Sequence, residues 1–259
     1  MGYYSVTVKP TIPVPATAFS NDDLLFDWVS FEIPKGTAKL VHVGATIIGT
    51  NTGSGNEHPM DMYFAKSING VAPATLGTCN AAITKANAVL SRQNMLSGAR
   101  WNASGMADTG SALGAGQYNV YGGPLDTAGA NLDIPNYPIV QGEGSDIVGG
   151  TTGYQTIYVA ASAQGAFDFG SAMLVDNGAG YAAGELGTIN LDGQAGDILF
   201  APGEELQAQD GAILGEVHTI SDDGSHTSLV IKGGLVEAIA DGDEISLRYP
   251  IVFNLGFEY

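Results

Sequence analysis

The stretch that decides the fold is PIVFNLGFEY, residues 250–259. Its apolar side chains recur at every second position, at Ile251, Phe253, Leu255, Phe257 and Tyr259. A period of two is typical of a β-strand with one buried face, because successive side chains of a strand point to opposite sides. Chain ends commonly fray. Because this end is so apolar, we expect the segment to be held within a sheet.

The composition agrees with a turn-rich β protein. The chain has 259 residues, of which 37 are Gly, 44% are apolar and 14% are charged, which suffices for one large domain or two smaller ones. Its 27 acidic residues outnumber 9 basic ones and give a net charge of −18. Such a negative field repels nucleic-acid phosphates and anionic lipids. We therefore expect no nucleic-acid partner. We also expect no membrane partner, because no apolar run approaches the ~20 residues of a membrane helix.

The first residues predict a strand followed by an arm. Tyr4, Val6 and Val8 alternate with polar residues, and three prolines follow within residues 10–15. Proline fixes the backbone in an extended form and cannot sit in a central strand. Residues 1–18 are therefore interpreted as an N-terminal strand and a Pro-rich extended arm. They lack the basic start and apolar run of a secretory signal, so export by that route is not expected.

The middle of the chain is less patterned. Residues 80–95 are rich in Ala and place Ile83, Ala86 and Leu90 on one helical face, but frequent Asn and Ser leave a short helix and an irregular segment equally open. Residues 96–153 are dense in Gly, Ala, Ser and Asn. Their scattered aromatic residues favour long loops packed on the scaffold or on neighbouring molecules.

The last third changes in character. Residues 160–259 hold 16 of the 27 acidic residues and two basic ones, Lys232 and Arg248. Short apolar runs alternate there with tight-turn signals such as Asp210-Gly211 and Asp241-Gly242. We expect a small acidic β module at residues 175–249, inserted into a main domain formed by residues 19–174 plus 250–259. Two consecutive domains are the alternative.

The predicted fold class is therefore all-β. The main domain is expected to be a β-sandwich of jelly-roll-like type that is closed by the C-terminal strand. The inserted module is expected to resemble a small β-barrel.

No pattern in the sequence points to catalysis. Cys79 is the one cysteine, which excludes an intrachain disulfide, and a buried apolar role suits it. The four histidines lie in strand patterns or polar turns, and no serine has a G-x-S-x-G elbow around it. Acidic turns at residues 222–223 and 241–244 could hold a calcium ion through oxygen ligands, but they lack the twelve-residue calcium-loop pattern. We predict no enzyme, no cofactor and no metal site.

Three segments carry a resemblance. They are FSNDDLLFDWVSFEIPKGTAKL (residues 19–40), MDMYFAKSINGVAPATLGT (residues 60–78) and the run that begins GDILFAPGEELQAQDGAILGEVHTI (residues 196–220). The first two resemble virion structural proteins of tailed bacteriophages, especially those of marine cyanobacteria, and the third resembles small β modules found in phage structural proteins. The resemblance covers about half of the chain, and its motifs are structural. It implies a protein assembled in the host cytoplasm and located in the virion.

These observations favour a capsid decoration or cement protein that binds the major capsid protein as a homo-oligomer, with a trimer expected by analogy with shell-decorating proteins. A tail or fibre component or host-binding adhesin is the first alternative, and an extracellular carbohydrate-active protein is the second. The candidate interface comprises the aromatic and proline residues of the arm and loops: Tyr3, Tyr4, Pro10, Pro13, Pro15, Trp101, Tyr118 and Tyr121. Proline lowers the ordering cost of docking, which suits such an arm for binding a neighbour's groove.

Overall fold

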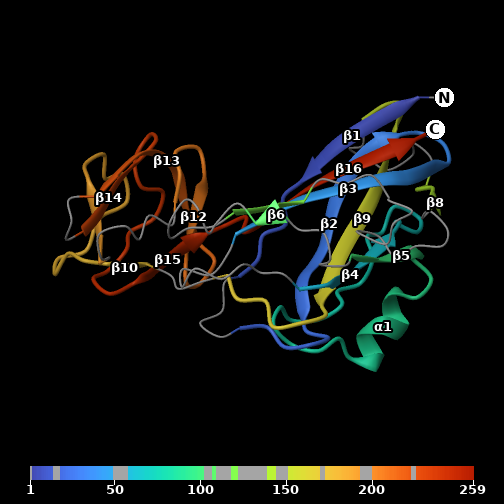
Figure 1. The fold of residues 1–259 in the computed structure, drawn as a ribbon, viewed down its shortest axis with the longest axis horizontal. Coiled ribbons are helices and arrows are strands. Elements are labelled where there is room, and N and C mark those ends of the chain that lie inside the picture. The colour runs from blue at the N-terminus through green and yellow to red at the C-terminus, as the bar shows by residue number, and fades with distance from the viewer. Residues whose placement is uncertain are drawn as a thin grey trace.

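A computed structural model describes residues 2–13, 18–48, 58–101, 107–108, 118–121, 139–143, 151–169, 173–192, 200–222 and 226–259. Within these ranges the protein is built almost wholly from β-strands, with one short helix. Figure 1 shows two parts, a larger one that contains both chain ends and a smaller one beside it. The expectation of an all-β fold with a small barrel module is confirmed.

The larger part consists of two sheets. The first has the order β1 (Tyr3–Val8), β16 (Ile251–Glu258), β3 (Ala38–Ile48), β7 (Tyr118–Tyr121) and β6 (Ala107–Asp108), and β8 (Ile139–Val140) also pairs with β3. The second has the order β2 (Leu24–Pro34), β9 (Tyr154–Ala163), β4 (Met60–Ala65) and β5 (Met95–Trp101). Neighbouring strands in both sheets are antiparallel.

The strand order of the larger part is that of a jelly roll. When β6, β8 and the smaller part are left out and the remaining eight strands are numbered along the chain, the sheets read 1-8-3-6 and 2-7-4-5. The two sheets pack face to face through aromatic pairs, since Phe26 lies 5.8 Å from Phe253 and Phe31 lies 5.9 Å from Phe257, centroid to centroid. This part is called the sandwich below.

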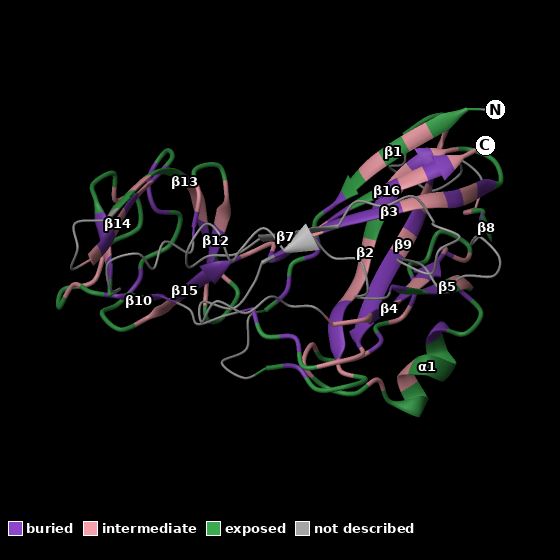
Figure 2. Cartoon of the chain, in the orientation of Figure 1, coloured by how far each residue is buried: buried purple, intermediate pink, exposed green. Residues whose placement is uncertain are grey.

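The C-terminal stretch is the centre of the first sheet. β16 lies between β1 and β3, and Ile251, Phe253, Leu255 and Phe257 are fully buried. The alternation read from the sequence is thus confirmed through the strand, and Figure 2 shows its buried and less buried positions in turn. Tyr259 lies just beyond the strand and donates its backbone N–H to the Gly2 carbonyl at 3.0 Å.

The smaller part is a closed barrel with the order β10 (Met173–Val175), β11 (Ile189–Asp192), β14 (His226–Ile231), β13 (Ile213–Asp222), β12 (Glu205–Ala208) and β15 (Glu244–Leu247). Strands β12, β13 and β14 follow one another, and β15 returns beside β12, which is a Greek key. In the chain, the barrel strands stand between β9 and β16 of the sandwich.

The N-terminal arm is packed at the junction of the two parts. Ile12 is fully buried, and its carbonyl accepts a hydrogen bond of 2.8 Å from the Gln207 side chain of β12. Its N–H donates to the Arg248 carbonyl at 3.4 Å. The buried apolar residues of sandwich and barrel form one continuous cluster that includes Val8 and Ile12. The arm therefore connects the two parts of its own chain.

Residues 66–94 form a flap across the outer face of the second sheet. The flap contains the helix α1 (Lys85–Ser91), so the helical reading of this region is confirmed over seven residues. The expected apolar face does not point inward, because Leu90 is exposed while Ser91 is buried. The loop reading of residues 96–153 is wrong for β5, which ends at Trp101, and for the short strands β6, β7 and β8.

Candidate binding cavity and interface residues

A cavity of about 300 Å³ lies between the flap and the outer face of the second sheet. Ligand pockets in proteins range from roughly 300 to 1,000 Å³, so this one suits a small molecule. Its walls are mainly apolar, with three polar side chains from the sheet side. It is lined by Asp22, Tyr63, Leu76, Ala82, Ile83, Ala88, Ser91, Met95 and Ser162.

The polar floor of the cavity comes from two neighbouring strands. Tyr63 of β4 and Ser162 of β9 share a hydrogen bond of 2.9 Å between their hydroxyl oxygens. Both residues point to the outer face because strand side chains alternate. Tyr63 pairs with Ala160 and Asp61 pairs with Ser162, so Tyr63 and Ser162 are diagonal neighbours on that face. Burial raises the pKa of Tyr63 above its ordinary value. The floor therefore offers neutral hydroxyl groups at physiological pH.

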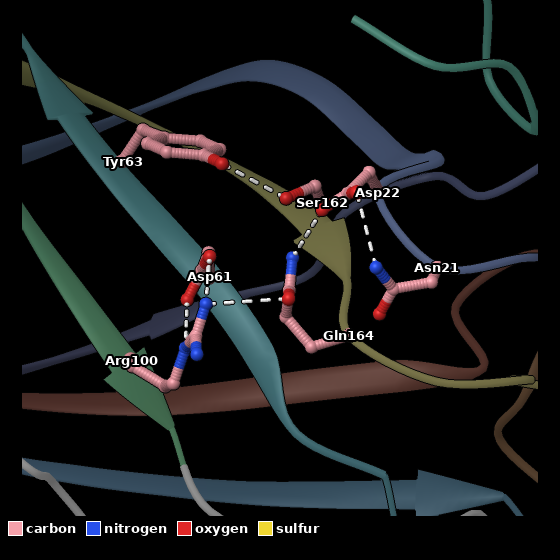
Figure 3. Close-up of polar contacts among 7 residues, drawn as sticks. All are labelled: Asn21, Asp22, Asp61, Tyr63, Arg100, Ser162 and Gln164. Carbon is pink, nitrogen blue, oxygen red and sulfur yellow. Dashed lines mark hydrogen bonds and ion pairs between the residues drawn. The ribbon is translucent and has the colours of Figure 1, made fainter.

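A chain of polar contacts runs beside this floor (Figure 3). Arg100 binds the Asp61 carboxylate through two hydrogen bonds of 2.7 and 2.8 Å, and it also donates to Gln164 at 3.2 Å. Gln164 in turn donates to Asp22 at 2.9 Å. Asp22 has a left-handed backbone, with φ of 69°, which aspartate adopts more readily than most residues. The network thus fixes the carboxylate that stands at the cavity wall.

The flap is anchored by hydrogen bonds from buried or half-buried side chains. The Ala74 carbonyl accepts from the Trp28 indole at 2.9 Å and from the Ser91 hydroxyl at 2.6 Å. The Leu76 N–H donates to Asp27 at 3.0 Å. Cys79 donates its thiol to the Leu25 carbonyl at 3.0 Å, and burial raises its pKa to about 12. The cavity is consequently held open by its own frame and needs no ligand to form.

The lining of the cavity suits a small ligand with an apolar body. A mainly apolar molecule with one or two hydrogen-bonding groups would place these groups on Tyr63, Ser162 and Asp22. Among the lining residues, Asp22 is the one carboxylate and there is no histidine, so the lining presents neither a nucleophile beside a base nor the two facing carboxylates of a glycosidase. Two facing carboxylates would favour a carbohydrate-active protein, the second alternative.

The described ranges hold no cluster of three or more potential metal ligands. The acidic turn at residues 241–244 has a structural use instead. Asp241 accepts the N–H of Asn177 at 2.9 Å, and Asp243 accepts the N–H of Ala240 at 2.6 Å. The side chains of residues 222–223 lie outside the described part of the chain.

The structure does not gather the eight predicted interface residues onto one surface. Tyr3 is largely exposed on β1, whereas Tyr4 is half-buried with its ring 6.0 Å from that of Tyr154. Pro13 is exposed, and Pro15 lies outside the described residues. The Tyr118 and Tyr121 backbones belong to β7, and their side chains are not described.

Two of the predicted interface residues need correction. Trp101 is buried against Phe253, with their ring centroids 6.3 Å apart, because it ends a strand of the second sheet. Pro10 is buried at the junction of the sandwich and the barrel. Neither side chain is accessible to a partner, and up to residue 13 the arm is partly packed on its own chain, with Pro10 and Ile12 buried and Pro13 exposed.

No known protein family and no curated protein sequence matches this chain. In the described ranges, the single helix is too short and too polar to cross a membrane. The resemblance to virion proteins therefore stays a prediction, and function has to be argued from the geometry.

Proposed function

We propose that this chain is a non-enzymatic structural protein of a tailed-phage virion, which binds the major capsid protein on the outer shell as a homo-oligomer and stabilises it. The architecture is the observation that carries the proposal. A jelly roll, a fold that recurs in viral capsid proteins and in lectin domains, bears a barrel beside its last strand. This support is an analogy at the level of the fold.

The distribution of charge is consistent with such a role. Residues 173–247 contain 14 acidic residues and a single lysine, for a formal charge of −13. A barrel that points outward with this charge would keep neighbouring particles apart in solution. The sandwich, which carries the smaller share of the negative charge, would then face the shell.

The decisive measurement is the copy number of the chain in purified particles, by quantitative mass spectrometry. Hundreds of copies are expected for a shell protein, and a few to a few tens would place the chain in the tail. Co-sedimentation with empty heads is the second arm of the test. Saturable binding to heads is expected, and its absence would contradict the proposal.

A host-binding adhesin is a second candidate, and the cavity is the observation that favours it. Binding modules use preformed, mainly apolar pockets with a few oriented polar groups. A screen of small ring compounds and sugars by thermal shift would test it. A ligand of this site should lose affinity in Tyr63→Phe and keep it in Tyr158→Phe, a half-buried tyrosine of the same sheet face.

A further inference from the structure

The outward face of α1 is an apolar surface flanked by positive charge. Val89 is 52% exposed and Leu90 is 65% exposed. Lys85 and Arg92 lie four residues before and three residues after Val89, so they share its side of the helix. Figure 2 shows α1 exposed along most of its length. These four residues are called the helix surface.

The charge around the helix surface is one-sided. Residues 62–107 contain four basic residues and no acidic residue. Arg100 is neutralised by Asp61. Lys85 and Arg92, by contrast, have no carboxylate partner within the described part of the chain. An apolar surface next to unpaired cations calls for a partner that is apolar and acidic.

The barrel carries a surface of that kind. Leu186 is 71% exposed and Val236 is 58% exposed, and their segments adjoin because the Leu235 N–H donates to the Glu185 carbonyl at 2.9 Å. Val236 also donates its N–H to the Leu214 carbonyl, which places it near exposed Ile213. Glu185 directly precedes Leu186 in the sequence, and Glu237 directly follows Val236. The barrel surface is defined as Glu185, Leu186, Ile213, Val236 and Glu237.

The single lysine of residues 173–247 does little to offset this negative charge. Lys232 is the one basic residue of residues 173–247, and it is paired with Glu216 at 2.9 Å. The barrel surface therefore stays acidic while it exposes apolar side chains. Figure 1 shows the barrel and α1 at opposite ends of the protein, so one copy cannot bring its own two surfaces together.

We propose that the helix surface of one copy binds the barrel surface of a second copy. Two helix surfaces would repel each other, as would two barrel surfaces, so the complementary contact is heterologous, with a different surface from each copy. Heterologous contacts close into rings or continue as filaments. A closed ring agrees with the trimer expected from the sequence. The inference rests on the homo-oligomer in the proposed function and identifies its interface.

Two interface variants test the contact. The helix variant is Val89→Glu with Leu90→Glu, and the barrel variant is Leu186→Glu with Val236→Glu. Because all four positions are exposed, both variants should keep the wild-type circular dichroism spectrum and melting temperature. Each should weaken self-association by about 30-fold or more in sedimentation velocity, the loss of one interface hot spot. Ile139→Glu, at an exposed position of β8, is the matched control and should assemble as the wild type does.

Mixing the two variants gives the sharper result. The helix variant keeps an intact barrel surface and the barrel variant keeps an intact helix surface, so an equimolar mixture should form a 1:1 dimer that cannot grow. The affinity of the wild type should also fall as salt rises, since exposed charges are screened. Wild-type self-association by either variant alone, a mixture of the two that stays monomeric, or a wild type that stays monomeric at about 0.1 mM would overturn the inference. Binding of these same variants to empty heads tests the proposed function separately.

Discussion

The sandwich and the barrel are both antiparallel β-structures, but they are assembled from different parts of the chain. In the sandwich, Tyr3 pairs with Glu258, so its first sheet joins the two ends of the sequence. In the barrel, all six strands come from residues 173–247. Closing a long loop costs more entropy than closing a short one, and non-local pairing slows folding. The sandwich should therefore depend on both chain ends, whereas the barrel should not.

The two parts also differ in whether they have edge strands. The sandwich leaves edge strands such as β1 and β5, while the barrel closes on itself and has none. The barrel nevertheless carries most of the negative charge, −13 of −18. The buried apolar cluster that spans both parts takes most of its residues from the sandwich, whereas the charge of the barrel favours solubility.

Removal of residues 251–259 should have the largest effect. Four fully buried side chains would leave the core, at ~1.5–3 kcal/mol each, which rivals the ~5–15 kcal/mol of a whole domain. We expect the sandwich to unfold and the barrel amides to stay protected. Both tryptophans lie in the sandwich, at residues 28 and 101, so fluorescence reports its loss and hydrogen exchange reports the barrel. A truncated protein with native fluorescence and a wild-type melting temperature would contradict this expectation.

Replacement of Ile12 tests whether the two parts are as separate as their topology suggests. Ile12→Ala removes a fully buried side chain at the junction and should lower the free energy of unfolding by ~2–5 kcal/mol. Ile139→Ala, at an exposed position, should change it by less than about 0.5 kcal/mol. Urea titrations followed by fluorescence and by far-UV circular dichroism would measure both. If the fluorescence and circular dichroism transitions of Ile12→Ala coincide, the two parts still unfold as one unit. If these transitions separate while those of the wild type coincide, the arm couples the two parts.

The elements with a strong local sequence pattern were predictable from the sequence. β16 was predictable because five alternating apolar residues leave no helical alternative. The barrel was recognisable from closely spaced turn signals and a shift in charge. Both features depend on residues that are near each other in the chain, where sequence patterns carry physical meaning.

The errors concern contacts between distant residues. The Ile12 carbonyl is bound by a side chain 195 positions away, so no local pattern could show that the arm packs on its own barrel. Trp101 looked like a loop aromatic because Ser97 and Gly98 hide the alternation of β5. The helix surface had a signal that was missed: residues 62–107 carry four cations and no acid, and Val89 follows Lys85 at helical spacing.

The smallest expected effect concerns Cys79. This residue ties the flap to the sandwich, and the barrel has no cysteine. Its folded pKa of about 12 lies above the ~8.5 of a free thiol, so the folded state holds the proton more tightly. The stability that this provides is fully present below pH ~8.5 and is lost as the pH rises towards 12. Between pH 8 and about 10.5, the wild type should therefore lose stability more steeply than Cys79→Ala, in urea titrations read by fluorescence.

Thiol alkylation supplies the control for that comparison. The native thiol should react slowly at pH ~8.5 and quickly once urea unfolds the sandwich, because the thiolate is the reactive form. The Leu25 carbonyl holds the proton in place, so the reaction should also follow local opening of the flap. A native thiol that reacts at the rate of a free one would show that the flap is detached, and the cavity beneath it would then not be preformed.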